Sequence, residues 1–399
     1  MSTETEILEL DHAWRTEPRW ARVTRPYRAA DVIRLRGSLR PEHAAARRGA
    51  EKLWDGLHSG RQVHALGALT GDQAVQMARA GLEAIYASDW QVATGAAEAV
   101  PDPGTYPSSS VPALVRRIRA CLERADEIHR ALGRDGIDWH PSIVADAEAG
   151  CGGGPNAFEL TKRMIAAGAA CVRFGDRLPA AKGSAHPGGK VLAPAQELVQ
   201  KLVAARFAAD VLGVPTLILA RTDALGAELL AGGADPRDGA CLAGERTPDG
   251  LLPMRAGMDE AVARAIAYAP LADVLWCESS APDLDEARRF ACAVHARLPG
   301  KLLAYDCSPS LDWRERLDAA AVASFQRELA SMGYRFQLVT RAGFHALDVA
   351  AFDLASRYRA EGVRAFARPT GTELAAEERR FAAASRLEPE GPGLRLVVG

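Results

Sequence analysis

Three acidic residues have the type and spacing to hold a hard metal ion. Asp146 and Glu148 stand two residues apart after the apolar run Ile143-Val-Ala145, so we expect them on one face of a strand end. Asp102 supplies a third carboxylate. Carboxylate oxygens are the ligands that Mg2+ prefers, with Mn2+ as the alternative ion. The competing interpretation is that these residues cap helices or pair with arginines, as acidic residues often do.

Cationic and hydroxyl side chains follow other apolar runs and could bind carboxylates. Arg221 ends one run beside Asp223, and a guanidinium can hold a carboxylate in two hydrogen bonds. A structural Arg–Asp pair is equally compatible with this spacing. Ser308, Ser310 and Thr340 add hydroxyls suited to a second carboxylate, although such residues often belong to turns.

The segment 182–190 is rich in glycine and contains two lysines and His186, which is typical of a mobile loop that closes over a charged substrate. A solvated basic loop is the alternative, and the phosphate-binding motif GxxxxGK[ST] is not matched. His345 begins a helical pattern, and we interpret it as a packing residue without a catalytic role.

Eight short apolar runs alternate with helical patterns, which predicts an α/β fold, a closed parallel (β/α)8 barrel of the TIM type. The runs are almost continuously apolar, as strands covered on both faces are. Several end in polar residues, at the edge where such barrels carry catalysis. The predicted strands span 63–69, 84–89, 139–146, 169–176, 215–223, 273–279, 302–308 and 335–343.

Additions flank the predicted barrel. Residues 1–60 predict an N-terminal helical addition, 61–360 the barrel with a small insertion at 232–256, and 361–399 a C-terminal helix and tail. Residues 388–399 lack a helical period, so we expect this tail to pack on a neighbour or to stay mobile.

The composition favours a globular protein with a small-molecule partner. The chain has 399 residues, of which 48% are hydrophobic and 25% charged, with a formal net charge of −2. This charge gives no attraction to nucleic acid or to an anionic membrane. The seven cysteines show no paired spacing, and the start has no signal-like segment, so we expect a cytoplasmic protein with reduced thiols.

These residues resemble the isocitrate lyase family from about residue 36 to about residue 360. The matching stretches include ALGALTG at 65–71, WQVA at 90–93, IVADAEAG at 143–150, GGKVL at 188–192, ILARTD at 218–223, WCE at 276–278, CSPS at 307–310 and AGFHAL at 342–347.

The resemblance implies a Mg2+-dependent carbon–carbon lyase that cleaves a 2-hydroxy carboxylate by retro-aldol chemistry. It implies that Asp146, Asp102 and Glu148 surround the metal ion. It also implies a homotetramer in which C-terminal helices are exchanged between subunits. The residues that it implies for binding substrate carboxylates are Arg221, Ser88, Trp90, His186, Ser308, Ser310 and Thr340.

The chain departs from the family at the catalytic loop, where Lys-Lys-Cys-Gly-His is replaced by Lys182-Gly-Ser-Ala-His186. Ser184 therefore stands in the place of a cysteine. A serine hydroxyl is a far weaker acid than a thiol, so we predict slow cleavage of isocitrate by the family's route. The catalytic residues we expect are Ser184, His186, Arg221 and Lys182.

Four further departures fall at the mouth of the barrel. Asp89 replaces a glycine, Arg173 a histidine, Gly175 a glutamate and Asp306 an asparagine. We expect Asp89, Arg173 and Asp306 to contact the substrate. Asp306 would repel a substrate carboxylate unless it is protonated or paired, so a substrate that lacks that group fits better.

Three functions stay open on the sequence. The first is a diverged lyase acting on a 2-hydroxy or 2-oxo acid other than isocitrate. The second is a genuine isocitrate lyase, forming glyoxylate and succinate, with a water or Tyr86 as the acid. The third is a catalytically silent relative that binds a metabolite. No residue selects the superfamily's other chemistries, which include phosphoenolpyruvate mutation and acyl hydrolysis.

Overall fold

The structure is a computed structural model. It describes residues 2–89, 91–92, 107–148, 152–178, 190–232, 235, 237–238, 241–308, 311, 313–367, 386–390 and 393–397.

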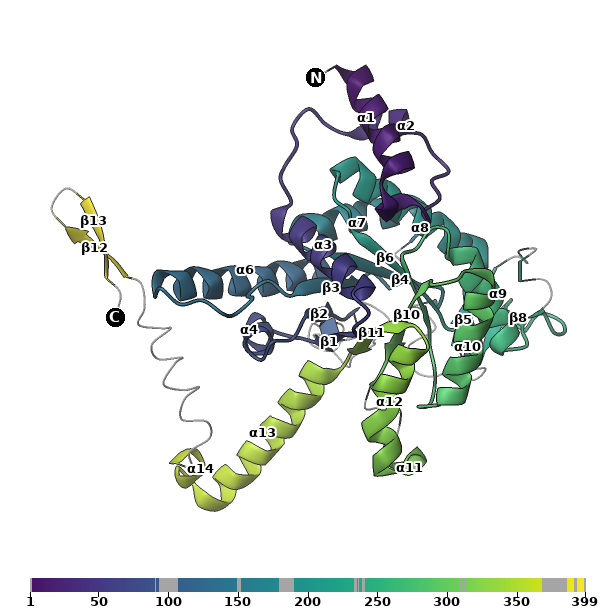
Figure 1. Ribbon diagram of the computed structural model, residues 1–399. Helices are drawn as coiled ribbons and strands as arrows, with labels where there is room; N and C mark the ends of the chain where they lie inside the picture. The colour runs from purple at the N-terminus through teal and green to yellow at the C-terminus, as the bar shows by residue number, and fades with distance from the viewer. Residues whose placement is uncertain are drawn as a thin grey trace.

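Eight parallel strands close into a barrel, as the sequence predicts (Figure 1). Their order around the barrel is β1-β11-β10-β9-β6-β4-β3-β2, so every strand pairs with its neighbours along the chain once the short additional strands are set aside. The barrel strands are β1 (Val63–Gly67), β2 (Ala84–Ala87), β3 (Ser142–Asp146), β4 (Cys171–Gly175), β6 (Leu217–Thr222), β9 (Val274–Cys277), β10 (Leu302–Asp306) and β11 (Tyr334–Val339).

A helix follows each barrel strand, which is the connection that parallel strands require. Most of these helices pack around the outside of the barrel, whereas α13 extends away from it (Figure 1). In chain order they are α4 (Gly71–Arg79), α6 (Ser110–Ala131), α7 (Gly154–Ala167), α8 (Ala195–Leu212), α9 (Met258–Tyr268), α10 (Leu284–Arg297), α12 (Ala319–Ser331) and α13 (Ala342–Glu361). Short helices after the first barrel strand, among the described residues, include η3 (Ala224–Gly226), α11 (Trp313–Arg316) and α14 (Arg364–Ala367).

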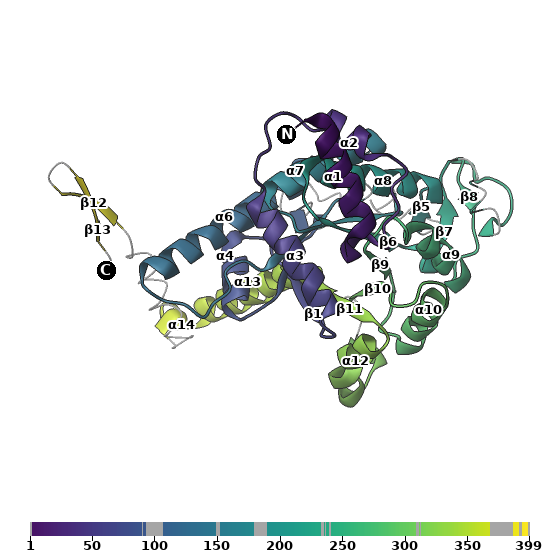
Figure 2. The same cartoon turned by 45° about the horizontal axis from the view of Figure 1, so that its top comes forward.

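The barrel interior is filled by large apolar side chains rather than left open. Tyr86, Trp276 and Phe336 belong to one buried cluster, and each is at most 2% exposed. Leu53 and Leu57 of α3 (Ala44–His58), the helix that precedes β1, join the same cluster. This helix therefore closes the amino-terminal end of the barrel, and only the opposite end is left for a polar site (Figure 2).

Ion pairs attach the segment before β1 to the barrel. Arg19 Nη1 lies 2.7 Å from Asp273 Oδ1, and Arg25 and Tyr27 each place a donor atom 2.7 Å from Asp210 Oδ2. These contacts are partly or fully buried, so the segment packs as part of the folded unit. Its elements are α1 (Thr3–Thr16), η1 (Pro18–Trp20), α2 (Ala29–Leu35) and α3 (Ala44–His58).

Two small sheets lie outside the barrel. β5 (Lys190–Leu192), β7 (Ala227–Leu230) and β8 (Leu252–Pro253) form the first, so the excursion predicted at 232–256 is joined to strands on either side of α8. The second is an antiparallel hairpin of β12 (Arg386–Glu390) and β13 (Gly393–Val397). The tail that lacks a helical period thus contains strand structure.

Gly67 shows why the ALGALTG stretch needs a glycine at the end of β1. A Cβ atom at this position would lie 2.0 Å from the carbonyl oxygen of Thr340. Any side chain would therefore push apart β1 and the end of β11, where Thr340 contributes to the polar end of the barrel. Among the described residues, no helix combines the length and the apolar character needed to cross a bilayer.

Candidate active site

Polar side chains from neighbouring strands meet at the carboxyl end of the barrel. Strand register sets Asp146 of β3 beside Arg173 of β4. It sets Gly175 beside Arg221 of β6, and Arg221 beside Trp276 of β9. These residues are far apart in sequence and become neighbours because parallel strands end at the same edge.

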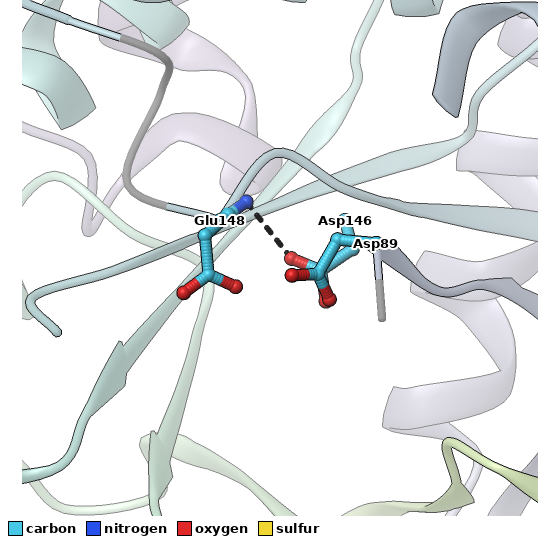
Figure 3. Close-up of side chains that lie close together, drawn as sticks. All are labelled: Asp89, Asp146 and Glu148. Carbon is cyan, nitrogen blue, oxygen red and sulfur yellow. Dashed lines mark hydrogen bonds between the residues drawn. The ribbon is translucent and has the colours of Figure 1, made fainter. Parts of the chain in front are cut away.

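Three buried carboxylates form a compact cluster at this edge (Figure 3). One oxygen each of Asp89, Asp146 and Glu148 lies within 4.8 Å of the others. Asp89 joins the two residues that the sequence analysis placed around a metal ion, although we had expected it to contact the substrate. Asp102 lies outside the described residues.

Glu148 reaches the cluster by a route that strand periodicity did not predict. β3 ends at Asp146, and Glu148 lies beyond it with a left-handed backbone, φ +51°. Its amide donates a hydrogen bond to Asp146 Oδ1 at 2.9 Å. A tight turn, rather than a shared strand face, therefore turns both carboxylates toward the same point.

The donor set of the cluster suits a hard divalent cation. Three carboxylate oxygens within 4.8 Å of one another would supply hard ligands, and oxygen ligands of this kind select Mg2+ or Mn2+ over softer metals. Tyr86 orients one of them, because its hydroxyl donates to Asp146 Oδ2 at 2.7 Å. Burial and the adjacent Asp146 carboxylate raise the pKa of Tyr86 well above its ordinary value, so it stays protonated.

Arg173 is buried against the same carboxylates. Its Nη1 lies 2.7 Å from Asp146 Oδ1 and 3.2 Å from Glu148 Oε2. Burial alone would lower the pKa of Arg173, but these carboxylates raise it well above its ordinary value, so the guanidinium is charged. Its Cζ also lies 5.3 Å from the ring centroid of Trp276.

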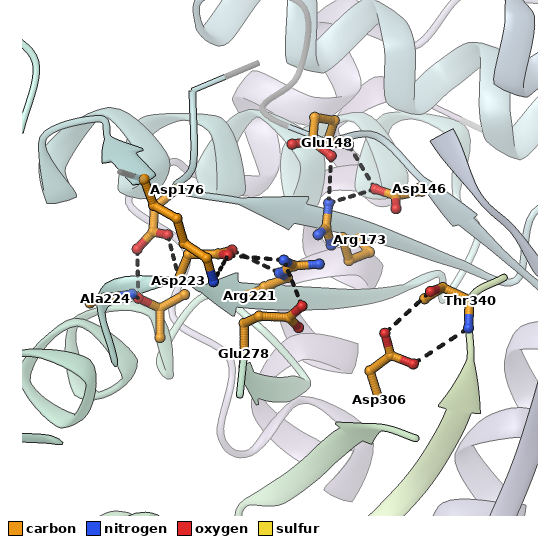
Figure 4. A network of polar contacts seen from close by, with 12 residues as sticks. Asp146, Glu148, Arg173, Asp176, Arg221, Asp223, Ala224, Glu278, Asp306 and Thr340 are labelled. Carbon is orange, nitrogen blue, oxygen red and sulfur yellow. Dashed lines mark hydrogen bonds and ion pairs between the residues drawn. The ribbon is translucent and has the colours of Figure 1, made fainter. Parts of the chain in front are cut away.

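Arg221 is held by two carboxylates (Figure 4). Its Nε and Nη2 lie 2.8 and 3.0 Å from the two oxygens of Asp223, and Nη2 lies 3.1 Å from Glu278 Oε1. The structural Arg–Asp pair considered in the sequence analysis is therefore present. Asp176 holds Asp223 in place for this pair. It accepts hydrogen bonds from the amide of Asp223 at 2.9 Å and from the Thr222 hydroxyl at 2.7 Å.

Glu278 is a candidate functional residue to which the sequence analysis gave no role. Its side chain is 18% exposed, and Oε2 has no hydrogen-bond partner among the described residues. Burial raises the pKa of Glu278 to about 7, with Asp223 and Asp306 adding to the shift and Arg221 opposing it. Its position directly after β9, within the polar Glu278-Ser-Ser280 cluster, was the available signal.

Asp306 lies among the hydroxyls that were expected to bind a substrate carboxylate. Ser308 Oγ donates to Asp306 Oδ1 at 2.7 Å, and Thr340 Oγ1 donates to Oδ2 at 3.2 Å. Burial raises the pKa of Asp306, and the Ser308 hydrogen bond opposes the shift. Ser308 and Thr340, which were expected to bind a substrate carboxylate, thus bind a carboxylate of the chain itself.

Of the remaining predicted site residues, the structure describes Ser88 alone. Ser88 is described and 1% exposed, directly before Asp89. The others lie outside the described residues, and their contacts remain predictions. They are Trp90, Asp102, Lys182, Ser184, His186 and Ser310.

The fold, with its buried polar residues at the carboxyl end, defines the class as a β/α-barrel enzyme. A model of the isocitrate lyase family matches residues 6–249 and 243–378. Isocitrate lyase of Escherichia coli K12 is 52% identical over 377 residues, covering 91% of this chain and 87% of that protein. Isocitrate lyase of Halalkalibacterium halodurans is 50% identical over 388 residues, covering 96% and 91%.

Solved structures share the fold at lower identity. Oxaloacetate acetylhydrolase, solved with the inhibitor 3,3-difluorooxalacetate, has a TM-score of 0.58 and 20% identity, over 84% of this chain and 97% of that chain. 2,3-Dimethylmalate lyase has a TM-score of 0.57 and 19% identity, over 82% and 90%.

This chain belongs to the isocitrate lyase family, as the resemblance indicated. It is a carbon–carbon lyase of that family, and the similarity supports an enzyme rather than a silent relative.

Proposed function

We propose that the protein cleaves isocitrate to glyoxylate and succinate. The observation that carries the proposal is the identity of about half of all residues to proteins named isocitrate lyase, over more than nine-tenths of this chain. Of the three functions left open by the sequence, this second one is better supported than the first, a diverged lyase that acts on an acid other than isocitrate.

The proposed reaction breaks the bond between C2 and C3 of isocitrate. The hydroxyl on C2 loses its proton to a base and becomes the aldehyde of glyoxylate. The electron pair of the broken bond stays on C3, which takes a proton from an acid and becomes a methylene of succinate. No oxidant or reductant is required.

Asp89, Asp146 and Glu148 would hold Mg2+ on the glyoxylate side, with Asp102 as the further ligand predicted from the sequence. When bound, such an ion polarises the 2-hydroxyl and its adjacent carboxylate. Tyr86 and the Glu148 amide already donate to Asp146, so the chain itself orients this ligand. Arg221, fixed by Asp223 and Glu278, would bind a substrate carboxylate with its remaining donors.

Glu278 is our candidate for the acid that protonates C3. A carboxyl with a pKa raised to about 7 is matched to proton transfer at neutral pH, and its Oε2 is not engaged by any described residue. Tyr86 is less suited, because its hydroxyl is fully buried and donates to Asp146. This assignment would compensate for the serine at position 184.

A homotetramer in a cytoplasmic setting is proposed for the assembly. The support is α13, in which only Gly343 is buried. Leu347, Val349, Phe352 and Tyr358 expose between 44% and 77% of their surface on this helix. A helix that exposes these large apolar side chains in one chain is suited to packing against a second copy.

A second candidate is cleavage of a 2-hydroxy acid that lacks the carboxylate at the succinate end. Asp306 favours it, because this side chain already accepts the hydrogen bonds of Ser308 and Thr340. A substrate carboxylate would find the hydroxyls of Ser308 and Thr340 already bonded to Asp306 and would be repelled by the ionised form of Asp306. A neutral or amine-bearing group would meet no such repulsion.

Product analysis separates the two candidates. The purified protein would be incubated with Mg2+ and either isocitrate or a series of 2-hydroxy acids that differ at the C3 substituent, and products would be measured by mass spectrometry. Equimolar glyoxylate and succinate from isocitrate support the first proposal. Cleavage confined to acids without the distal carboxylate supports the second.

A further inference from the structure

Arg173 places a permanent positive charge on two of the three carboxylates of the cluster. Its Nη1 donates to both Asp146 Oδ1 and Glu148 Oε2, at 2.7 and 3.2 Å. Asp146 Oδ1 also accepts from the Glu148 amide, and Oδ2 accepts from Tyr86. Oxygens that a divalent ion would use are therefore already engaged by donors of the chain.

We infer that Arg173 is a resident counter-cation that keeps this acidic cluster assembled without a metal ion and weakens the binding of one. This inference rests on the proposed metal site but not on the identity of the substrate.

The surroundings of Arg173 fix it in this role. The side chain is 2% exposed, so it cannot turn into solvent without opening the site. Its Cζ lies over the Trp276 ring, at 5.3 Å from the ring centroid. Arg221 lies over the same ring at 4.7 Å, which places a second positive charge nearby.

Gly175 provides the space for this arrangement. A Cβ atom at Gly175 would lie 3.6 Å from Cζ and Nη1 of Arg173, in ordinary contact, and its nearest neighbours all belong to that guanidinium. A longer side chain at this position would compete with Arg173 for the space beside the carboxylates. An acidic one would also pair with Arg173 and add negative charge to the cluster.

The cluster with Arg173 carries three carboxylates and one guanidinium, so it still attracts a divalent ion. A fixed positive charge on two shared ligands, however, opposes an incoming cation and competes for the same lone pairs. Removing that charge should tighten metal binding by about tenfold or more. Retaining it on a different side chain should leave binding weak.

The test measures Mn2+ binding directly, without substrate, from the electron paramagnetic resonance signal of free Mn2+ during titration. Arg173→Gln removes the charge, Arg173→Lys retains it, and Arg288→Gln is a control at an exposed surface ion pair. We expect Arg173→Gln to bind Mn2+ about tenfold or more tightly than the unaltered protein. Arg173→Lys and Arg288→Gln should stay near the unaltered value.

Gly175→Glu is an independent second variant, because it leaves Arg173 in place and should also tighten Mn2+ binding. A folded Arg173→Gln protein with unchanged or weaker Mn2+ affinity would overturn the inference. If Arg173→Gln does not fold, an unchanged affinity in Gly175→Glu overturns it. Absence of Mn2+ binding in every variant overturns it as well.

Failure of the proposed function would look different. Tighter Mn2+ binding by Arg173→Gln in a protein that does not cleave isocitrate would uphold the inference and reject that substrate. Isocitrate cleavage with no effect of Arg173→Gln on Mn2+ binding would support the proposed substrate and overturn the inference.

Discussion

The Ser308 hydroxyl donates a hydrogen bond to Asp306 Oδ1 at 2.7 Å, so a carboxylate of the chain accepts from a group expected to bind the substrate. Thr340 makes the same kind of contact with Oδ2 at 3.2 Å. At the end of the site opposite the acidic cluster, a carboxylate of the chain thus lies where a substrate carboxylate was expected.

Replacing Asp306 with asparagine should therefore improve the use of isocitrate. The asparagine side chain would keep hydrogen bonds to the hydroxyls but remove the charge that repels the distal carboxylate. We expect kcat/KM for isocitrate to rise by about tenfold, which corresponds to roughly 1.4 kcal/mol, mainly through a lower KM. Steady-state kinetics measure this, and an unchanged KM would show that Asp306 does not face the substrate.

Glu278→Gln tests the proposed acid. An amide cannot donate the required proton at a useful rate, so kcat should fall by about 10²- to 10⁴-fold. In the unaltered protein, kcat should decline as the pH rises past about 7, because the acid must be protonated. A rate that rises through this range would assign Glu278 to the base instead.

The raised pKa of Glu278 also predicts that the unaltered protein and Glu278→Gln differ in stability in a pH-dependent way. The folded-state pKa of about 7 lies above the ordinary 4.5, so the folded chain holds the proton more tightly than the unfolded chain. Stability from this group is complete below about pH 4.5 and is lost as the pH rises through about 7. Glu278→Gln should therefore gain about 1–3 kcal/mol over the unaltered protein between pH 5 and pH 8, measured by urea denaturation.

Removal of divalent ions should stop turnover without unfolding the protein. Chelation would remove the ion proposed at Asp89, Asp146 and Glu148, while Arg173 continues to pair with two of these residues. We expect activity to be lost with EDTA and restored by Mg2+, with native circular dichroism throughout. Full activity in EDTA would contradict a metal-dependent route.

Phe352→Asp should break the proposed tetramer. Phe352 is 77% exposed on α13, and a carboxylate at a packed helix interface would be left desolvated. Light scattering coupled to gel filtration should show a tetramer for the unaltered protein and smaller species for the variant. Arg288→Gln, at an exposed position outside α13, serves as the matched control. A monomeric unaltered protein would contradict the assembly.

Much of the fold could be predicted from the sequence. Buried parallel strands must be apolar on both faces, and runs such as Leu217–Thr222 therefore stand out from the helices between them. Short strands outside the barrel, such as Lys190–Leu192, gave no such signal, because they take their structure from β7 rather than from their own pattern.

The site was predictable in its residue types but not in its pairings. Carboxylates and arginines at strand ends were visible, yet Glu148 enters through a left-handed turn and Asp89 joins from another strand end. That Arg173 would pair with Asp146 depends on the register of β3 against β4, which no local pattern encodes. The raised pKa of Glu278 likewise depends on burial beside residues from other strands.

The most direct measurement is glyoxylate release from isocitrate in the presence of Mg2+, with Asp146→Asn as the metal-site control and Ser184→Cys as a variant that restores the thiol of the family's loop. We expect equimolar glyoxylate and succinate from the unaltered protein, a rate with Ser184→Cys close to that of the unaltered protein because Glu278 supplies the proton, and loss of activity in Asp146→Asn. A folded, Mn2+-binding protein that releases no glyoxylate from isocitrate would contradict the central claim and point to a substrate without the distal carboxylate.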